Sequence, residues 1–135
     1  MYKSTLVAAA LAAVLLTARP ASTAPTAKAP AEANIGFVVY TKSLSPGTLN
    51  ARWMLSTKYR GPGIATGGPK TGFAGRYHVR YFLESGAFSD EYDLLIEQIE
   101  DVYKVSWFVK GELKATGVGM EVENGLAVGW RRMTD

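Results

Sequence analysis

The side chains best suited to hold a small molecule lie together on one face of a predicted sheet. Six are aromatic, with a hydroxyl or an indole N–H at the tip, and one is an amide. They are Tyr77, Tyr81, Tyr92, Gln98, Tyr103, Trp107 and Trp130. Aromatic rings supply apolar contact area, while a few polar tips orient a ligand. The same pattern also suits a filled core whose hydroxyls point to the ends, so a ligand cavity and a packed core both remain open.

Signals for other chemistry are weaker. His78 is the only histidine and is expected on the outward face between Arg76 and Arg80, opposite Leu95, with no carboxylate to orient it for catalysis. Zinc lacks ligands, because the chain has no cysteine and one histidine. We therefore expect no metal, no cofactor and no recognisable catalytic group.

A glycine-rich segment, Gly63 to Thr71, superficially resembles a phosphate-binding loop. Pro69 separates Gly68 from Lys70, and no helix follows that would direct its dipole at a phosphate. We interpret the segment as a connection at the mouth of the fold.

Residues 1–33 have the layout of a secretory signal peptide followed by a flexible arm. Lys3 precedes an apolar run from Leu6 to Leu16, and Ala, Pro, Ser and Thr dominate from there to Ala33. The run is shorter than the roughly 20 residues that a membrane-spanning helix needs. The sequence thus predicts export to the periplasm or the extracellular space without stable membrane insertion.

The exported part is nearly neutral. Residues 34–135 hold 12 Lys or Arg against 11 Asp or Glu, because Lys3, Arg19, Lys28 and Glu32 precede them, and the net charge is +1. Basic and acidic residues are interleaved, whereas nucleic-acid binding calls for a concentrated positive patch. We expect no nucleic-acid partner, and the oligomeric state stays open.

Short apolar segments separated by turn residues, without a sustained period near 3.6, predict one all-β domain over residues 34–135. The expected fold is an antiparallel up-and-down meander of seven to eight strands, closed into a small barrel. A two-sheet sandwich is the alternative. In the first half, strands are expected at 35–42 and 50–56, with a short one at 63–67.

Turn chemistry predicts the pairing of the later strands. A two-residue turn at Glu100-Asp101 sets Ile96 opposite Val105 and Leu94 opposite Trp107. The preceding pair is expected to place Tyr81 opposite Tyr92.

Two further hairpins complete the predicted meander. A turn at Gly111-Glu112 would put Val105 beside Val118, and a three-residue loop with Gly125 left-handed would set Met120 opposite Val128. On this register Val118 and Met120 point inward.

A resemblance follows from four segments: Gly75-Arg76-Tyr77-His78-Val79, Tyr103-Lys104-Val105-Ser106-Trp107, Gly117-Val118-Gly119 and Leu126-Ala127-Val128-Gly129-Trp130. Their arrangement resembles small exported bacterial proteins of uncharacterised function with an avidin-like or lipocalin-like meander. Avidin-like barrels bind biotin and lipocalins bind apolar molecules. The resemblance implies the architecture only, since no ligand-contacting residue of those families is matched here.

Three functional classes follow from these observations. The first is a non-enzymatic exported barrel that binds a small apolar or aromatic molecule in its interior, or a partner through its loops. The second is a cyclase or isomerase that works by confinement and a polar group such as Tyr81 or Arg60. The third is a structural or host-contact protein of the envelope. The sequence alone does not decide whether the protein is an enzyme.

Overall fold

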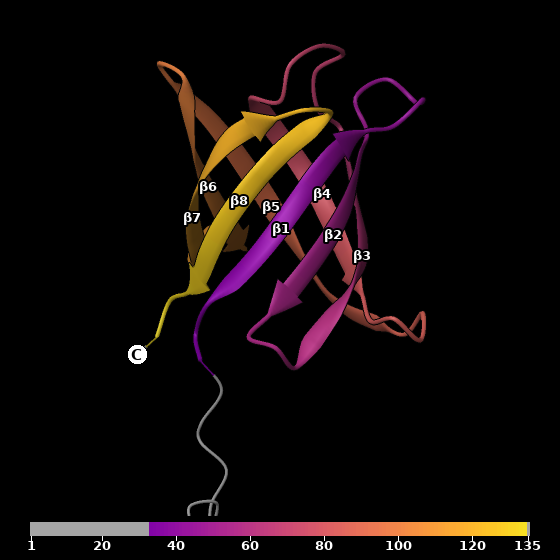
Figure 1. Ribbon diagram of the computed structural model, residues 1–135, viewed down its shortest axis with the longest axis vertical. Coiled ribbons are helices and arrows are strands. Elements are labelled where there is room, and N and C mark those ends of the chain that lie inside the picture. The colour runs from indigo at the N-terminus through magenta and orange to yellow at the C-terminus, as the bar shows by residue number, and fades with distance from the viewer. Residues whose placement is uncertain (1–32, 135) are drawn as a thin grey trace, which may run out of the picture. The chain divides into compact units, whose positions relative to one another are not determined.

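The computed structural model describes residues 33–134, which form eight antiparallel strands closed into a barrel (Figure 1). Each strand pairs with the next along the chain, and the last pairs with the first. The strands are β1 (Gly36–Lys42), β2 (Leu49–Leu55), β3 (Tyr59–Thr66), β4 (Gly75–Phe82), β5 (Phe88–Ile99), β6 (Val102–Val109), β7 (Glu112–Val122) and β8 (Gly125–Arg132). This confirms the predicted all-β barrel. The predicted signal peptide lies outside the described residues, and within them no helix could cross a membrane.

The two ends of the barrel differ in their connections. The end that we call the loop end carries the β1–β2, β3–β4, β5–β6 and β7–β8 connections. The opposite end, which we call the terminal end, carries the start of β1 and the end of β8, at the bottom of Figure 1.

The loop end is closed by the β3–β4 connection. Phe73, in the middle of that connection, is buried and belongs to the hydrophobic core. The Tyr77 hydroxyl donates a hydrogen bond of 2.8 Å to the carbonyl of Phe73. Its ring lies against Gly68, where a Cβ atom would come within 2.0 Å of the ring. A glycine is therefore required at Gly68, and the segment that resembled a phosphate loop packs over the barrel instead.

The third strand is longer than the sequence suggested. The third strand covers Tyr59–Thr66 rather than residues 63–67. Gly61, Pro62 and Gly63 weaken its β-strand signal, because neither glycine nor proline favours a strand interior. The glycines lie against the neighbouring strand: a Cβ at Gly61 would lie 1.9 Å from the carbonyl oxygen of Phe82.

The registers of the central hairpins are confirmed in part. Leu94 lies opposite Trp107 and Ile96 opposite Val105, as predicted. In the β4–β5 pair, however, Tyr92 lies opposite Val79 rather than Tyr81. This shift of two residues keeps every side chain on its predicted face.

The predicted pairing of β7 is wrong by one residue, both with β6 and with β8. The β6–β7 turn is Lys110-Gly111, with φ values of 51° and 83°, and the left-handed residue of the β7–β8 turn is Asn124, with φ 67°, rather than Gly125. A bulge lies next to this turn, between Trp107 and Phe108 on β6. Because the two one-residue shifts are opposite, β8 keeps its predicted face toward the interior. β7 presents the other face, so Val118 and Met120 point outward.

Two glycines take the inward positions of β7. Gly117 lies opposite Val105, and a Cβ there would be 2.5 Å from the carbonyl oxygen of Gly129. At Gly119 the corresponding atom, the carbonyl oxygen of Ala127, would be 2.8 Å away. The close neighbour of both glycines is thus the β8 backbone.

Candidate functional site

Five aromatic side chains converge inside the terminal half of the barrel. We call Trp53, Tyr81, Tyr92, Trp107 and Trp130 the aromatic cluster. The ring of Tyr81 lies 6.1 Å from that of Trp53 and 6.1 Å from that of Tyr92, and the rings of Trp107 and Trp130 lie 6.0 Å apart. These centroid distances are typical of edge and tilted aromatic pairs. The cluster forms because each of β2, β4, β5, β6 and β8 places one inward-facing aromatic residue at a similar height along the barrel axis.

The inner part of the cluster is tied together by hydrogen bonds. The hydroxyls of Tyr40 and Tyr81 lie 2.6 Å apart, and the Trp107 indole N–H donates to the Tyr81 hydroxyl at 2.8 Å. All three residues are buried. Burial raises the pKa of both hydroxyls, and that of Tyr81 is raised further by the neighbouring Tyr40. These groups are therefore neutral hydrogen-bonding groups at physiological pH.

The outer part of the cluster is only partly buried. Trp53, Tyr92 and Trp130 pack against the core but retain exposed surface. The Tyr92 hydroxyl donates a short hydrogen bond of 2.5 Å to the Asp90 carboxylate. Burial, followed by this bond, raises the pKa of Tyr92, and the positive charge of Arg132 opposes the rise. A carboxylate and a guanidinium thus accompany the exposed aromatic edges.

Near the terminal end, the backbone packs closely against two of the partly exposed rings. A Cβ at Gly36 would lie 2.2 Å from the Trp130 ring, so the indole covers the β1 backbone directly. The Trp53 indole N–H donates to the carbonyl of Phe82 at 3.0 Å. Two of the three partly exposed rings are therefore held in place by adjacent backbone.

The seven residues predicted as a ligand site do not form one group. Tyr81, Tyr92, Trp107 and Trp130 belong to the aromatic cluster, but the other three lie toward the loop end. Tyr77 is bonded to the β3–β4 connection. Tyr103 is buried and donates to Glu121, and this bond raises the pKa of Tyr103 to about 12. Gln98 is exposed and donates to the carbonyl of Glu100.

Two members of the site were missing from the sequence prediction. Tyr40 is fully buried, and Trp53 completes the aromatic cluster. The alternation of Val38 with Tyr40 on β1, and of Ala51 with Trp53 on β2, is the signal that could have identified them.

The surroundings of His78 also differ from the prediction. It points outward, but it lies opposite Asp93 rather than Leu95. Its ring nitrogens are 3.5 Å from the Glu91 carboxylate and 3.7 Å from the Asp93 carboxylate. Glu91 also pairs with Arg80 at 3.4 Å. This exposed network is a surface salt bridge of the kind that contributes little to stability.

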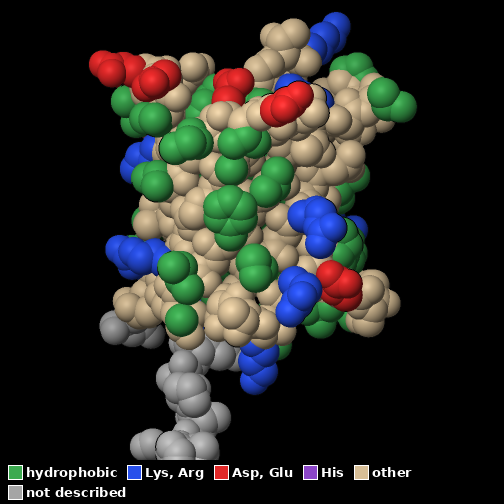
Figure 2. Space-filling view, in the orientation of Figure 1, with side chains coloured by type: hydrophobic (Ala, Val, Ile, Leu, Met, Phe, Trp, Pro, Cys, Tyr) green, Lys and Arg blue, Asp and Glu red, His purple; other side chains and the backbone are tan. Residues whose placement is uncertain are grey.

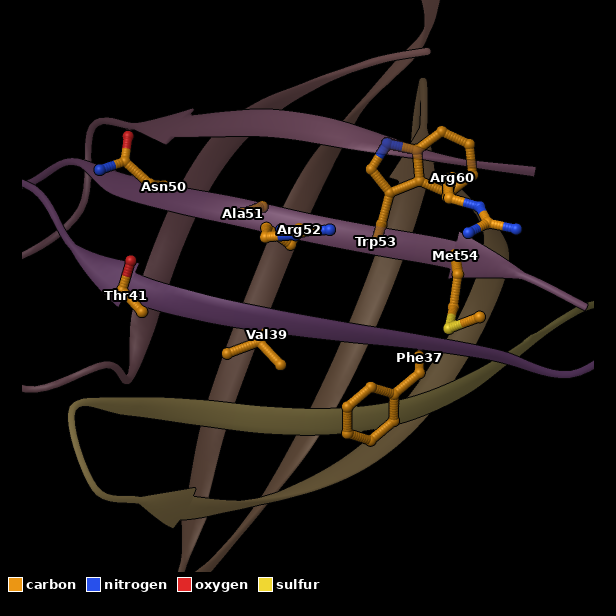
Figure 3. Close-up of a pocket in the computed structure, with 9 residues that line it drawn as sticks. All are labelled: Phe37, Val39, Thr41, Asn50, Ala51, Arg52, Trp53, Met54 and Arg60. Atoms are coloured by element: carbon orange, nitrogen blue, oxygen red, sulfur yellow. The ribbon is translucent and has the colours of Figure 1, made fainter. Parts of the chain in front are cut away.

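A hollow lies on the outer wall over β1, β2 and β3. Its volume is about 450 Å³, and its lining is mainly apolar. Figure 3 shows the side chains of Phe37 and Met54 side by side on β1 and β2, with Arg60 on the neighbouring strand. Arg52 and Arg60 are the charged residues of the lining. The hollow is open to solvent, and Trp53 of the aromatic cluster also borders it. Arg60 lies in this outer lining, whereas Tyr81 is buried inside the barrel.

No group of histidine and carboxylate side chains within residues 33–134 has a geometry that could hold a metal ion. Comparison of the chain with protein-family models, with curated proteins and with solved structures found no match.

Proposed function

We propose that this is an exported, non-enzymatic β-barrel protein that binds a small apolar or aromatic molecule at the aromatic cluster. One observation carries the proposal: three large aromatic rings at the terminal end stay partly exposed although they adjoin a well-packed core. Burying such surface is favourable, by roughly 25 cal/mol per Å² of apolar area. A flat apolar molecule inserted among these edges would complete their burial.

The polar groups beside the rings suggest how such a molecule would be oriented. Asp90 offers a carboxylate and Arg132 a guanidinium at the same end. A ligand with an apolar body and one polar substituent fits this arrangement, because pockets combine apolar lining with a few polar groups. The likeness to avidin-like and lipocalin-like barrels supports the proposal only at the level of architecture.

The enzyme alternative has less support. The Tyr81 hydroxyl is engaged by both Tyr40 and Trp107, and its raised pKa makes it a poor acid or base near neutral pH. Arg60 lies on the outer wall. The two polar groups suggested for confinement catalysis would therefore not act on one substrate.

Export to the periplasm or the extracellular space is part of the proposal. It rests on the short apolar run from Leu6 to Leu16 behind Lys3, followed by residues rich in Ala, Pro, Ser and Thr. N-terminal sequencing of the protein recovered from an expression host's secreted fraction tests it. Retention of residues 1–33 in the mature protein would contradict export by this leader.

Tryptophan fluorescence tests the binding proposal. Titration with a panel of aromatic and lipophilic compounds should shift the emission for at least one compound. The aromatic cluster contains all three tryptophans of the chain, so a molecule bound there changes their surroundings. For that compound, Trp130→Ala should weaken binding about tenfold, the loss expected for one aromatic contact of about 1.4 kcal/mol.

Phe37→Ala is the matched control, because it removes an aromatic ring from the outer hollow and leaves the aromatic cluster intact. A flat response across the panel would refute binding. Weaker binding in Phe37→Ala alone would assign the ligand to the outer hollow.

A further inference from the structure

The outer hollow over β1, β2 and β3 is a concavity that the proposed function leaves unused. Its volume of about 450 Å³ lies within the range of small-molecule sites in proteins. Strand pairing sets its outward side chains in rows across the sheet, Phe37–Met54–Arg60 and Val39–Arg52. From Phe37 to Thr41 the lining extends for about 13 Å along β1. A hollow of this length can hold one extended chain.

The β1 side of the hollow is apolar. Phe37 is 43% exposed, and Val39 and Met54 are half-buried although they point away from the core. Figure 2 shows the side of the barrel that carries β8, β1 and β2, with hydrophobic side chains across its middle. Lys and Arg side chains lie toward its lower right, where acidic surface appears only at the edge. An apolar chain laid over the β1 side would remove this hydrophobic surface from water.

The β2 and β3 side of the hollow carries two guanidinium groups without an acidic partner. Arg52 and Arg60 are exposed, and within residues 33–134 neither pairs with a carboxylate. Arg60 makes one long hydrogen bond, of 3.4 Å, to the carbonyl of Thr57. The two arginines hold diagonal positions on neighbouring strands, which are about 7–8 Å apart. Since β1, β2 and β3 contain no Asp or Glu, an anion from outside would relieve their repulsion.

We propose that the outer hollow binds a single-chain apolar carboxylate. Its alkyl chain lies along Phe37, Val39 and Met54, and its head group lies between Arg52 and Arg60. A carboxylate has two oxygen atoms, one for each guanidinium, and charge-assisted bonds of this kind are strong. A phosphate would leave further charged oxygens without a cation. Because the apolar residues line a hollow rather than protrude, they fit one molecule better than a bilayer surface.

An NMR titration of the protein produced from the full chain, with octanoate and with octanol, tests the proposal. Octanoate should shift the backbone amide signals of residues 37–41 and 50–54, and it should bind at least about tenfold more tightly than the uncharged alcohol. Arg52→Gln and Arg60→Gln should each weaken octanoate binding about fivefold and change octanol binding by less than about twofold. Arg76→Gln is the matched control, because it removes the same charge from an outward position of β4, outside the hollow. It should bind octanoate like the wild type.

The apolar contact is tested separately. Phe37→Ala should weaken octanoate and octanol by a similar factor, about threefold to tenfold, because it removes apolar surface and no charge. Unequal losses, with octanol unaffected, would contradict the placement of the alkyl chain.

Four results would overturn the proposal. They are equal affinity for octanoate and octanol, no shift with octanoate at about 1 mM, binding to anionic lipid vesicles without binding to octanoate, and loss of octanoate binding in Arg132→Gln but not in Arg52→Gln. The last result would place the anion at the aromatic cluster, where Arg132 lies beside Tyr92. None of these outcomes depends on whether neutral aromatic compounds bind at that cluster.

Discussion

Replacing Tyr81 by phenylalanine removes one hydroxyl and leaves two buried polar groups without their partner. The Tyr40 hydroxyl loses its contact at 2.6 Å, and the Trp107 indole N–H loses its acceptor at 2.8 Å. A buried polar group without a partner costs about 1–3 kcal/mol. We expect Tyr81→Phe to lower the free energy of unfolding by about 2–4 kcal/mol.

The partner substitution should cost less. In Tyr40→Phe the Tyr81 hydroxyl still accepts from Trp107, so the expected loss is about 1 kcal/mol. The double variant leaves only the Trp107 N–H unpartnered. It should therefore lose about 1–3 kcal/mol, less than the sum of the single losses.

Urea unfolding followed by tryptophan fluorescence measures these differences, provided that the denaturant dependence is the same in all four proteins. A loss below about 0.5 kcal/mol in Tyr81→Phe, or strict additivity of the two substitutions, would refute the buried hydrogen-bonded core.

Three further predictions use the same stability assay. Trp107→Ala should cost about 3–5 kcal/mol, because it empties the middle of the core, and a loss below about 1 kcal/mol would mean that the side chain is not buried. Gly36→Ala should cost about 1–3 kcal/mol by displacing the Trp130 ring, whereas Gly129→Ala should change stability by less than about 0.5 kcal/mol. The raised tyrosine pKa values, including about 12 for Tyr103, predict stability that is full below pH 10 and falls as pH rises toward 12, because the unfolded chain ionises first. Absorbance at 295 nm against pH should then show tyrosines ionising together with unfolding, and complete ionisation near pH 10 in the folded protein would contradict this.

Strand periodicity and turn chemistry predicted the all-β barrel and the central hairpin. The Leu94–Trp107 pairing followed from one two-residue turn, because both faces of β5 and β6 agree with it. The register error at β4–β5 arose in the connection, because the strands stay paired as far as Phe82 and Phe88 and a bulge then adds one residue between Tyr81 and Phe82. A bulge leaves no clear mark in a sequence.

The error at β7 has a different physical cause. The prediction placed Val118 and Met120 inside because apolar residues are normally buried, but the inward positions are Gly117 and Gly119. Close approach of the β8 backbone demands glycine there, and that distance cannot be deduced from strand alternation. Val118 and Met120 therefore lie on the outer surface, 71% and 59% exposed.

The candidate site was predicted only in part, because the first half of the chain was not assigned to faces. Tyr81, Tyr92, Trp107 and Trp130 were placed correctly on the inward face, but no sequence argument divided the residues between the two ends of the barrel. That division depends on the stagger of all eight strands around the closed sheet.

The most direct test of ligand binding at the aromatic cluster is an NMR titration of the three tryptophan indole N–H signals with the compound panel. The account predicts that at least one compound shifts the signals of Trp53 and Trp130 strongly, with a smaller change for the buried Trp107. Signals that stay fixed for every compound, or a shift of Trp53 alone, which also borders the outer hollow, would contradict it.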